Sequence, residues 1–247
     1  MTALLELDCV TAGYVADIDI LREVSLAAAA GAITGLIGLN GAGKSTIMKT
    51  IAGFLPPRAG TIRFDGQDIT GIAPHQLLDR GIWYIPQESS LFPYMSVENN
   101  LRLPLEHLAR RKPGLSRGEL AARFADMLAQ FPVLGERLSA QAGDLSGGQQ
   151  KMVEFAKAYL VRPRLCLIDE PSIGLSPKIA EEVYGWIELF ANRSMAVLLV
   201  DHNVRRVVRM ASHIYVLSLG EIAADGAAQA FAGDLHEQVK GWLGINF

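Results

Sequence analysis

The sequence predicts an α/β protein in which helices cover both faces of a parallel sheet. Continuous apolar runs at residues 32–37, 165–168 and 196–200 alternate with segments of helical periodicity, and such runs are typical of parallel strands buried on both faces. A glycine-rich segment joins the first run to a helix. Between residues 88 and 163, strand signals give way to helical patterning, which predicts a helical subdomain inserted into the sheet.

Composition narrows the range of functions. The chain has 247 residues, half of them hydrophobic, which is enough for a full core. The net charge of −3 gives no general reason to expect nucleic-acid binding. No basic region follows Met1, so we expect no secretory signal. The uncharged run at 24–43 has the length of a membrane span but contains five glycines, so we predict that it does not cross a membrane.

The N-terminal part predicts an antiparallel β subdomain. Residues 4–10 alternate like an edge strand of a half-exposed sheet, and residues 61–64 and 67–69 flank the turn residues Asp65-Gly66 like a hairpin. A short helix near 74–80 and a strand at 82–85 should follow. Cys9 and Cys166 lie in apolar, strand-like stretches, which predicts buried thiols in a reducing cytoplasm.

The remaining elements complete a single predicted domain over 1–247. Ser116 and Glu119 form a capping box that begins an amphipathic helix. A hairpin at 214–217 and 221–223 should precede a short C-terminal helix. We assign 1–87 and 164–247 to a catalytic core with the β subdomain, and 88–163 to the helical subdomain.

Residues 38–46 fit the phosphate-binding pattern G-x-x-x-x-G-K-[ST] at each defined position, between a strand and a helix. Its glycines let backbone N–H groups surround an anion, so the loop predicts a P-loop NTPase core. We expect Lys44 to reach the β- and γ-phosphates and Ser45 to bind Mg²⁺. A glycine-rich turn before an ordinary helix is the alternative. The predicted nucleotide-binding residues here are Gly38, Asn40, Gly41, Ala42, Gly43, Lys44, Ser45 and Thr46.

Two carboxylates, Asp169 and Glu170, follow the buried strand at 165–168. The carboxyl end of a parallel strand faces the ligand site of such a sheet. Asp169 suits the surroundings of Mg²⁺ and its water ligands, and Glu170 suits the general base that polarises the attacking water. Such a pair can also cap a helix, but the phosphate loop favours catalysis.

A second glycine-rich helix start lies at residues 145–149, with Ser146, Gly147, Gly148 and Gln149 as candidate nucleotide contacts. Its helix N-terminus is a second anion site. One γ-phosphate cannot lie deep in two such loops of a small fold. The motif therefore predicts that one of the two loops comes from another subunit.

The ordered set of phosphate loop, Gln87, residues 145–149, Asp169-Glu170 and His202 resembles the ATP-binding subunits of ABC transporters over essentially the whole chain. The resemblance implies a RecA-like core that binds ATP and Mg²⁺ and hydrolyses ATP. It implies that Tyr14 stacks on adenine and that Gln87 senses Mg²⁺ and the attacking water. It also implies that Ser146 and Gly148 contact ATP on the opposite subunit and that His202 binds the γ-phosphate. Tyr14 as a strand-end aromatic and His202 as a structural histidine are the alternatives.

The resemblance also implies partners and a location. These are transmembrane permease subunits, a second ATP-binding subunit (identical or related) and, indirectly, a solute-binding protein, with no nucleic acid. The location is the cytoplasmic face of the inner membrane, as a peripheral subunit. About one hundred residues separate Ser45 from Leu145, too few for the coiled coil of chromosome-organising ATPases. A single cassette argues against the two-cassette translation factors.

Within transporters, residues 131–137, 174–177 and 242–244 resemble the ATPases of branched-chain amino-acid importers. Residues 84–88 and 201–205 also resemble the lipopolysaccharide-export ATPase. A regulator that binds ATP but barely hydrolyses it is a third possibility, against which Glu170 argues. Ser176 stands where many relatives have Asp; we expect an N-cap there, with Pro177 at the first helical position and Glu181-Glu182 in the first turn.

After Gln87 come four large apolar residues, Leu91, Phe92, Tyr94 and Met95, without helix or strand periodicity. They could be buried between the sheet and the helical subdomain. Alternatively, some of them form an exposed surface that receives a short helix of a membrane subunit. We expect the second arrangement, because the segment directly follows Gln87.

Overall fold

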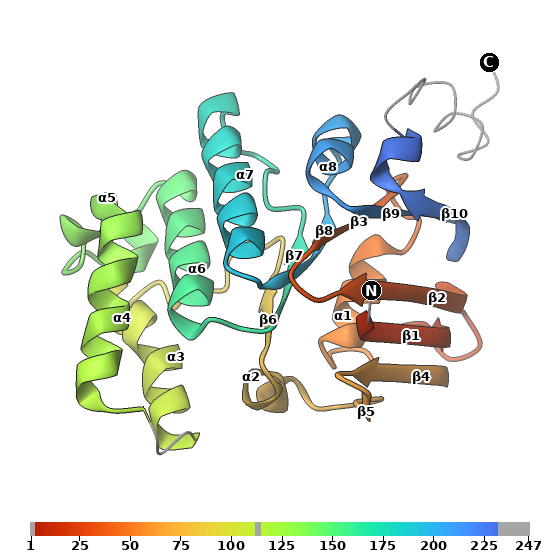
Figure 1. Ribbon diagram of the computed structural model, residues 1–247, viewed down its shortest axis with the longest axis horizontal. Helices are drawn as coiled ribbons and strands as arrows, with labels where there is room; N and C mark the ends of the chain where they lie inside the picture. Colours follow the sequence, from red (N-terminus) through yellow and green to blue (C-terminus); the bar gives the residue numbers. More distant parts are fainter. Residues whose placement is uncertain (1–2, 112–114, 232–247) are drawn as a thin grey trace.

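Parallel strands form the larger sheet of the protein (Figure 1). The computed structural model describes residues 3–111 and 115–231. Its six-stranded sheet has the order β10-β9-β3-β8-β7-β6, in which the neighbours from β9 to β6 are parallel and β10 is antiparallel to β9. The strands are β3 (Ile33–Gly38), β6 (Ile82–Ile85), β7 (Leu165–Asp169), β8 (Ala196–Val200), β9 (His213–Ser218) and β10 (Glu221–Ala227).

Alternate residues of these apolar strands enter opposite cores. On β7, Cys166 and Ile168 belong to one buried cluster, whereas Leu165 and Leu167 belong to the other. The same alternation occurs on β8. The first cluster packs the sheet against α6 and α7, and the second packs it against α1 and the smaller sheet. Because both faces are covered, these two strands are apolar along their length up to the carboxylate that ends β7, Asp169. The predicted α/β fold with a parallel sheet is confirmed.

A four-stranded antiparallel sheet has the order β2-β1-β4-β5. Its strands are β1 (Ala3–Ala12), β2 (Leu21–Ala29), β4 (Ala59–Phe64) and β5 (Gln67–Asp68). The expected hairpin is confirmed, since Asp65 and Gly66 join β4 to β5 with φ of 53° and 72°, as a tight hairpin turn requires.

The expectation that residues 4–10 form an edge strand is wrong. β1 lies between β2 and β4, and β2, which begins just before the uncharged run, is at the edge. Alternation reports that one face of a strand is exposed, but it carries no information on how many neighbours the strand has. The uncharged run itself holds most of β2, all of β3 and the loop before α1. Among the described residues, no helix has the length and apolar character needed to cross a membrane.

Helices α3 to α6 gather beyond the β6 edge of the larger sheet, apart from the antiparallel sheet (Figure 1). The capping box of α4 is confirmed, because Ser116 Oγ accepts from Glu119 N at 3.1 Å and Glu119 Oε2 accepts from Ser116 N at 2.8 Å. The helices are α1 (Lys44–Ile51), α2 (Leu77–Arg80), α3 (Val97–Arg111), α4 (Arg117–Gln130), α5 (Pro132–Gly135), α6 (Gly147–Val161), α7 (Pro177–Asn192) and α8 (Val204–Met210), with 3₁₀ turns η1 (Pro74–Gln76), η2 (Ala142–Asp144) and η3 (Ala228–Phe231). The expected C-terminal helix lies outside the described residues.

The two cysteines differ in burial. Cys166 is buried in β7, as expected, but Cys9 is exposed. Cys9 has a φ of 49° and lies where the β1–β2 register shifts between Leu7 and Val10. An irregularity of this kind breaks the in–out alternation, which is why the sequence pattern misplaced its side chain.

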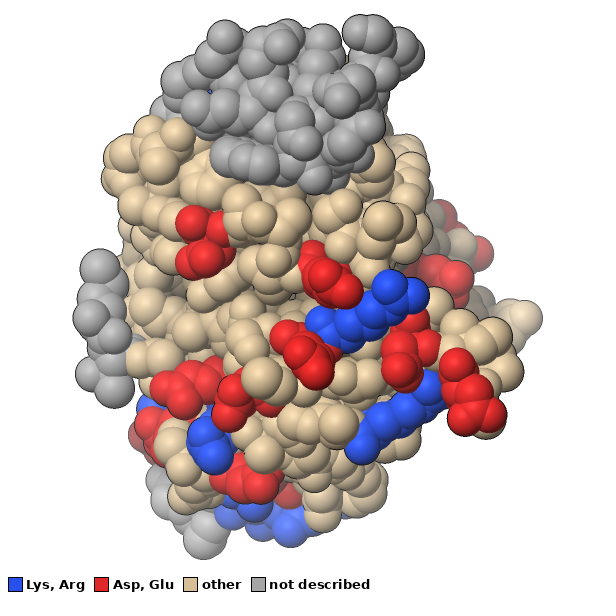
Figure 2. All heavy atoms as spheres, turned by 90° about the vertical axis from the view of Figure 1, so that its right-hand side faces the viewer, with Lys and Arg blue, Asp and Glu red and all other residues tan. Residues whose placement is uncertain are grey.

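Charges of both signs are interspersed on the side that carries β1, β2, β4 and β10 (Figure 2). Ion pairs next to the smaller sheet include Arg58 with Asp19 at 2.6 Å and Arg164 with Asp65. Because opposite charges neighbour one another, this side does not present a field of one sign.

Candidate active site

The phosphate-loop residues connect β3 to α1 through a tight backbone path. Gly43 is the N-cap of α1 with a φ of 108°, a left-handed conformation that favours glycine. A Cβ atom on Gly38 would lie 2.3 Å from the carbonyl oxygen of Leu217, so no side chain fits there. The loop therefore leaves its backbone amides and the start of α1 as the groups that can face a phosphate.

Lys44 lies inside this loop. Its side chain is only 4% exposed, and Nζ donates to the carbonyl oxygens of Gly38 and Leu39, both at 3.0 Å. Nζ also lies 3.9 Å from Oε1 of Glu170. The structure thus brings the predicted phosphate cation and the predicted general base, which are 126 positions apart in sequence (170 − 44), to one point.

Asp169 lies at the end of β7, where it is almost fully buried. Its Oδ1 accepts from the Ser45 hydroxyl at 3.2 Å and its Oδ2 accepts from the Tyr84 hydroxyl at 3.3 Å. Burial raises the pKa of Asp169 above its ordinary value, the hydrogen bond from Ser45 acts in the opposite direction, and the Glu170 charge raises the pKa further. Sequence analysis missed Tyr84, whose only signal was its place on the strand that pairs with β7.

Glu170 has a strained backbone, with a φ of 45° that side-chain-bearing residues seldom adopt. Its N–H donates to the carbonyl oxygen of Val200 at 2.8 Å, which ties it to β8. Strain of this kind persists where the surrounding structure enforces it, and such positions cluster at active sites.

The end of β8 adds Asp201 and His202. Asp201 is 1% exposed and accepts from the Ser172 hydroxyl at 2.9 Å and from Asn203 N at 2.8 Å. Nδ1 of His202 lies 3.4 Å from Oδ1 of Asp201, and the His202 side chain is 54% exposed. Asp201 thus lies beside the histidine and links the turns that follow β7 and β8. Sequence analysis missed Asp201. Its signal was that it directly follows the buried strand β8, much as Asp169 stands at the end of β7.

A cleft of about 690 Å³ joins further predicted residues to this edge of the sheet, since Tyr14, Ser45, Gln87 and Asp169 all line it. The Tyr14 side chain is exposed; its hydroxyl lies 3.5 Å from Thr46 Oγ1 and the Lys49 ammonium lies 5.8 Å from its ring centre. An exposed ring beside the phosphate loop can stack on a nucleotide base.

The motif at 146–149 lies elsewhere. Ser146 is the N-cap of α6, and it exchanges hydrogen bonds with Gln149 in a capping box. In Figure 1, α6 stands with α3 to α5 on one side of β6 to β8, whereas α1 lies on the other side. The structure therefore does not bring Ser146, Gly147, Gly148 and Gln149 to the phosphate loop of the same chain.

The predicted metal ligands Ser45, Gln87 and Asp169 all lie at the cleft beside the phosphate loop. The described part of the chain has no group of three or more His, Cys, Asp or Glu side chains that could hold a metal. Ser45 and Asp169 nevertheless place oxygen atoms 3.2 Å apart beside the phosphate loop, and Gln87 lines the same cleft. A few oxygen donors that leave positions for water and phosphate suit Mg²⁺, so these residues fit the ion.

Two expectations around Ser176 differ from the structure. Ser176 is the N-cap of α7 with Pro177 at the first turn, but its side chain makes no capping hydrogen bond. Glu181 and Glu182 lie beyond the first turn, which has no acidic residue. Ser176 has a φ of −64° and a ψ of 153°, the extended backbone conformation that is typical of an N-cap residue. Its backbone therefore marks the start of the helix even though its hydroxyl accepts no hydrogen bond there.

The segment after Gln87 is split between core and surface. Phe92 is 54% and Tyr94 90% exposed, whereas Leu91 is partly buried against the core. Asn100 holds this turn from α3: its Oδ1 accepts from Phe92 N at 2.9 Å, and its Nδ2 donates to the carbonyl oxygens of Phe92 and Ser96 at 3.0 and 3.1 Å. The aromatic side chains are thus presented on an anchored turn.

Known proteins are similar to this chain in sequence and in architecture. The family described as ABC transporter matches residues 21–173. BraG of Pseudomonas aeruginosa, a high-affinity branched-chain amino acid transport ATP-binding protein, is 33% identical over 209 residues, covering 85% of this chain and 87% of that protein. LptB of Escherichia coli strain K12, the lipopolysaccharide export system ATP-binding protein, is 34% identical over 229 residues, 92% of each chain.

A solved structure extends the likeness to the whole fold. A dimeric ATP-binding cassette in a post-hydrolysis state, bound to ADP and phosphate, superposes with a TM-score of 0.77 at 25% identity, covering 91% of this chain and 98% of that one. The fold, the phosphate loop with its opposed carboxylates, and these relatives agree. The chain belongs to the ABC transporter family, as an ATP-binding subunit with ATPase activity.

Proposed function

We propose that the protein powers the import of branched-chain or other hydrophobic amino acids, with the site around Lys44 hydrolysing Mg-ATP. The observation that carries the site assignment is the meeting of Lys44, Ser45, Asp169 and Glu170 at the carboxyl ends of β3 and β7. A cation, a hydroxyl and two carboxylates around an amide-lined loop are the groups that phosphoryl transfer requires.

Each residue has a distinct role in this proposal. Lys44 exchanges its loop carbonyl partners for the β- and γ-phosphates, so its charge is already in place when the nucleotide binds. Glu170 accepts a proton from the attacking water, and its enforced backbone conformation directs the carboxylate toward Lys44 and the phosphate position. His202, which lies beside Asp201, donates to the γ-phosphate. Tyr14 stacks on adenine.

Mg²⁺ would be held by Ser45 and, through water, by Asp169 and Gln87, and it would neutralise charge on the β- and γ-phosphates. Tyr84 keeps one Asp169 oxygen occupied while Ser45 approaches the other. Burial raises the pKa of this carboxyl more than its hydrogen bonds from Ser45 and Tyr84 lower it, so its negative charge is only partly compensated by protein neighbours. A divalent cation supplies that compensation.

The second subunit follows from the separation of α6 and α1. Ser146, Gly147, Gly148 and Gln149 offer a helix N-terminus that the phosphate loop of the same chain does not use. Two chains arranged head to tail would place each such motif on the nucleotide of the other. The similar cassette described above is dimeric, which supports a dimer of this chain, and the partner is either an identical chain or a related ATP-binding subunit.

The exposed Phe92 and Tyr94 are proposed to receive a short helix of a membrane permease. Aromatic side chains bury much area at an interface for little loss of conformational freedom. Since Asn100 fixes the turn, a movement of the segment that contains Gln87 would carry the docked helix with it. Through this contact the subunit would be a peripheral one, on the cytoplasmic face of the inner membrane, reached by a solute-binding protein only indirectly.

The cargo proposal depends on the relatives, and lipopolysaccharide export is the second candidate because the two identities are nearly equal. Residues 131–137 and 174–177 favour the amino-acid importers, whereas residues 84–88 and 201–205 also resemble the exporter. Cargo is selected by the membrane subunits, so this chain itself does not contact it.

The test uses the full chain assembled with its membrane subunits in lipid vesicles. ATP-dependent uptake of labelled leucine, isoleucine or valine supports the proposal, and the Glu170→Gln assembly is the matched control without hydrolysis. Release of lipopolysaccharide from the vesicles, without amino-acid uptake, would identify the exporter instead. Absence of ATP turnover in the purified wild-type chain would favour the regulator.

A further inference from the structure

Three charged side chains of α6 are buried where an apolar helix would pack. Lys151, Glu154 and Lys157 are 8%, 2% and 7% exposed, and their spacing by three residues places them within one face of the helix. Burying charges is unfavourable unless they are paired and hydrogen-bonded, and apolar side chains often pack as stably. These residues therefore call for an explanation other than stability.

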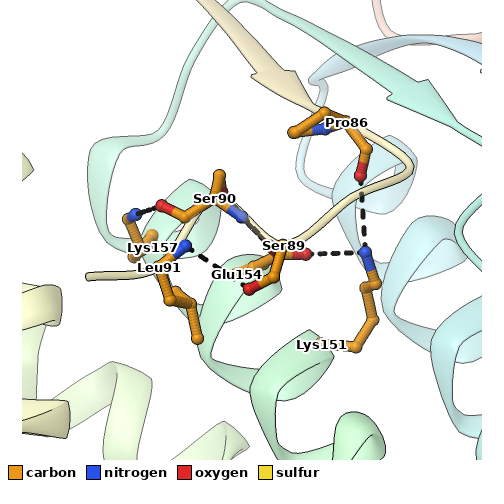
Figure 3. A network of polar contacts seen from close by, with 7 residues as sticks. All are labelled: Pro86, Ser89, Ser90, Leu91, Lys151, Glu154 and Lys157. Carbon is orange, nitrogen blue, oxygen red and sulfur yellow. Dashed lines mark hydrogen bonds and ion pairs between the residues drawn. The ribbon is translucent and has the colours of Figure 1, made fainter. Parts of the chain in front are cut away.

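The face they form holds the segment that contains Gln87 (Figure 3). Oε1 of Glu154 accepts from the N–H of Ser90 at 2.6 Å and from its hydroxyl at 3.2 Å. Lys157 donates to the Ser90 carbonyl oxygen at 3.3 Å. Lys151 donates to the other Glu154 oxygen at 2.7 Å and to the Pro86 carbonyl oxygen at 3.4 Å.

These contacts hold the chain on both sides of Gln87. Pro86 precedes it and Ser90 follows it, and both are attached through backbone groups to the same helix. Gln87 lines the cleft with Ser45 and Asp169. Lys157 also stacks against Trp83, 5.9 Å from its ring centre, and Trp83 lies on the strand that leads into the segment.

The helix that carries these three side chains, α6, begins at the 146–149 motif, which is proposed to contact the nucleotide of the partner. α6 starts at Gly147 and its N-cap is Ser146, so Lys151 lies about one turn and Glu154 about two turns further along. A helix moves as a rigid element over this length. A shift of its start against a nucleotide of the partner is thereby transmitted to Pro86 and Ser90, and so to Gln87.

We propose that Glu154, paired with Lys151 and assisted by the Lys157 bond to Ser90, is a positioning residue that fixes the Gln87 segment to α6, so that ATP bound on the partner sets the position of Gln87 at this subunit's own ATP. The proposal rests on the dimeric arrangement proposed above. The link makes the two sites of a dimer cooperative: engagement of one nucleotide by Ser146 and Gly148 places Gln87 for hydrolysis of the other.

The main test is Glu154→Gln in the full chain. The amide preserves the shape and an acceptor for Ser90 but loses the charge-assisted bond to Lys151 and the charge attraction to Lys157. Turnover is measured against ATP concentration, together with nucleotide affinity and thermal unfolding. We expect affinity to stay within about twofold, turnover at saturating ATP to fall roughly fivefold or more, and the Hill coefficient to fall from above 1 in the wild type to about 1.

Asp126→Asn is the matched control. Asp126 accepts from Tyr159 at 3.1 Å and from Arg162 at 2.9 Å at the other end of α6, and neither contact involves the Gln87 segment. This variant should lower the unfolding temperature while leaving the Hill coefficient unchanged. If Glu154→Gln fails to fold, the apolar triple variant Lys151→Met, Glu154→Leu, Lys157→Met replaces it. This variant removes the contacts of α6 with Pro86 and Ser90 without leaving a buried charge unpaired.

A folded variant with wild-type turnover and Hill coefficient would overturn the proposal, as would a wild-type Hill coefficient of 1 in an active dimer. A wild-type chain that neither hydrolyses ATP nor dimerises with it would instead contradict the proposed function. The two failures are therefore distinguishable in the same set of measurements.

Discussion

Lys44 and His202 lie at different depths of the proposed site. Lys44 is buried in the loop, whereas His202 is half exposed after β8. We expect Lys44→Ala to weaken nucleotide binding by about 1.5–3 kcal/mol, because it removes a buried charge from the β- and γ-phosphates. His202→Ala should leave affinity nearly unchanged and lower turnover roughly a hundredfold, since its contact strengthens as charge moves onto the γ-phosphate.

Equilibrium nucleotide titration and steady-state turnover on the two variants separate these roles. An equal loss of affinity in both variants would show that His202 binds the ground state and that its assignment is wrong. Ser172→Ala, which removes a hydrogen bond to Asp201 at 2.9 Å without touching the histidine, should give a smaller loss of turnover in the same direction as His202→Ala.

Asp169 leads to a prediction on pH and stability. Burial raises the pKa of this carboxyl in the folded protein above 3.8. The folded state then binds the proton more tightly than the unfolded state, so stability falls as pH rises from about 3.8 through the folded pKa. Asp169→Asn should therefore raise the unfolding temperature of the nucleotide-free protein at neutral pH.

The same substitution should reduce the further stabilisation by Mg-ATP, because it removes the negative charge of the carboxylate beside the proposed Mg²⁺ position. Differential scanning calorimetry with and without Mg-ATP measures both effects. A lower unfolding temperature for the nucleotide-free variant would mean that the hydrogen bonds from Ser45 and Tyr84 outweigh the desolvation of the charge.

At the scale of elements, variants in the turn after Gln87 should affect docking to the membrane subunits without affecting the stability of the isolated subunit. Phe92 and Tyr94 are exposed, so Phe92→Ala and Tyr94→Ser should change the free energy of unfolding by no more than about 0.5 kcal/mol. ATP turnover of the isolated subunit should also be unchanged. Assembly with the membrane subunits, measured by co-purification, should fail.

Phe131→Ala is the contrast for this prediction. Phe131 is 1% exposed and packs against Tyr159 and Trp186, so its truncation should destabilise the isolated subunit by about 3–5 kcal/mol. A comparable loss of stability in Phe92→Ala would show that the turn belongs to the core and would refute the docking assignment.

At the scale of the whole molecule, the proposed dimer needs ATP that is bound but not hydrolysed. Glu170→Gln replaces the basic carboxylate by a carboxamide of the same shape. ATP should then stay bound without being hydrolysed and hold two subunits together. Size-exclusion chromatography with Mg-ATP is expected to show a dimer for Glu170→Gln. The double variant Lys44→Ala, Glu170→Gln is the control and should elute as a monomer, and a strictly monomeric Glu170→Gln protein would contradict the arrangement.

The sequence alone predicted the strands β6, β7 and β8, the β4–β5 hairpin, the capped helix α4 and the chemical groups of the site. Each of these is a local signal: an apolar run, a turn pair, a capping box or a motif within nine residues. Local signals report which residues of a segment face inward and which backbone conformation they prefer, and both are decided by neighbours in the chain.

Only the tertiary structure decided which segments meet. β1 is central rather than at an edge because β2 and β4 both pair with it, and Cys9 is exposed because that pairing shifts register beside it. Tyr84 reaches Asp169, Ser172 reaches Asp201 and Glu154 reaches Ser90 across 85, 29 and 64 positions. Such contacts depend on the order of strands and the packing of α6, which periodicity along the chain does not encode.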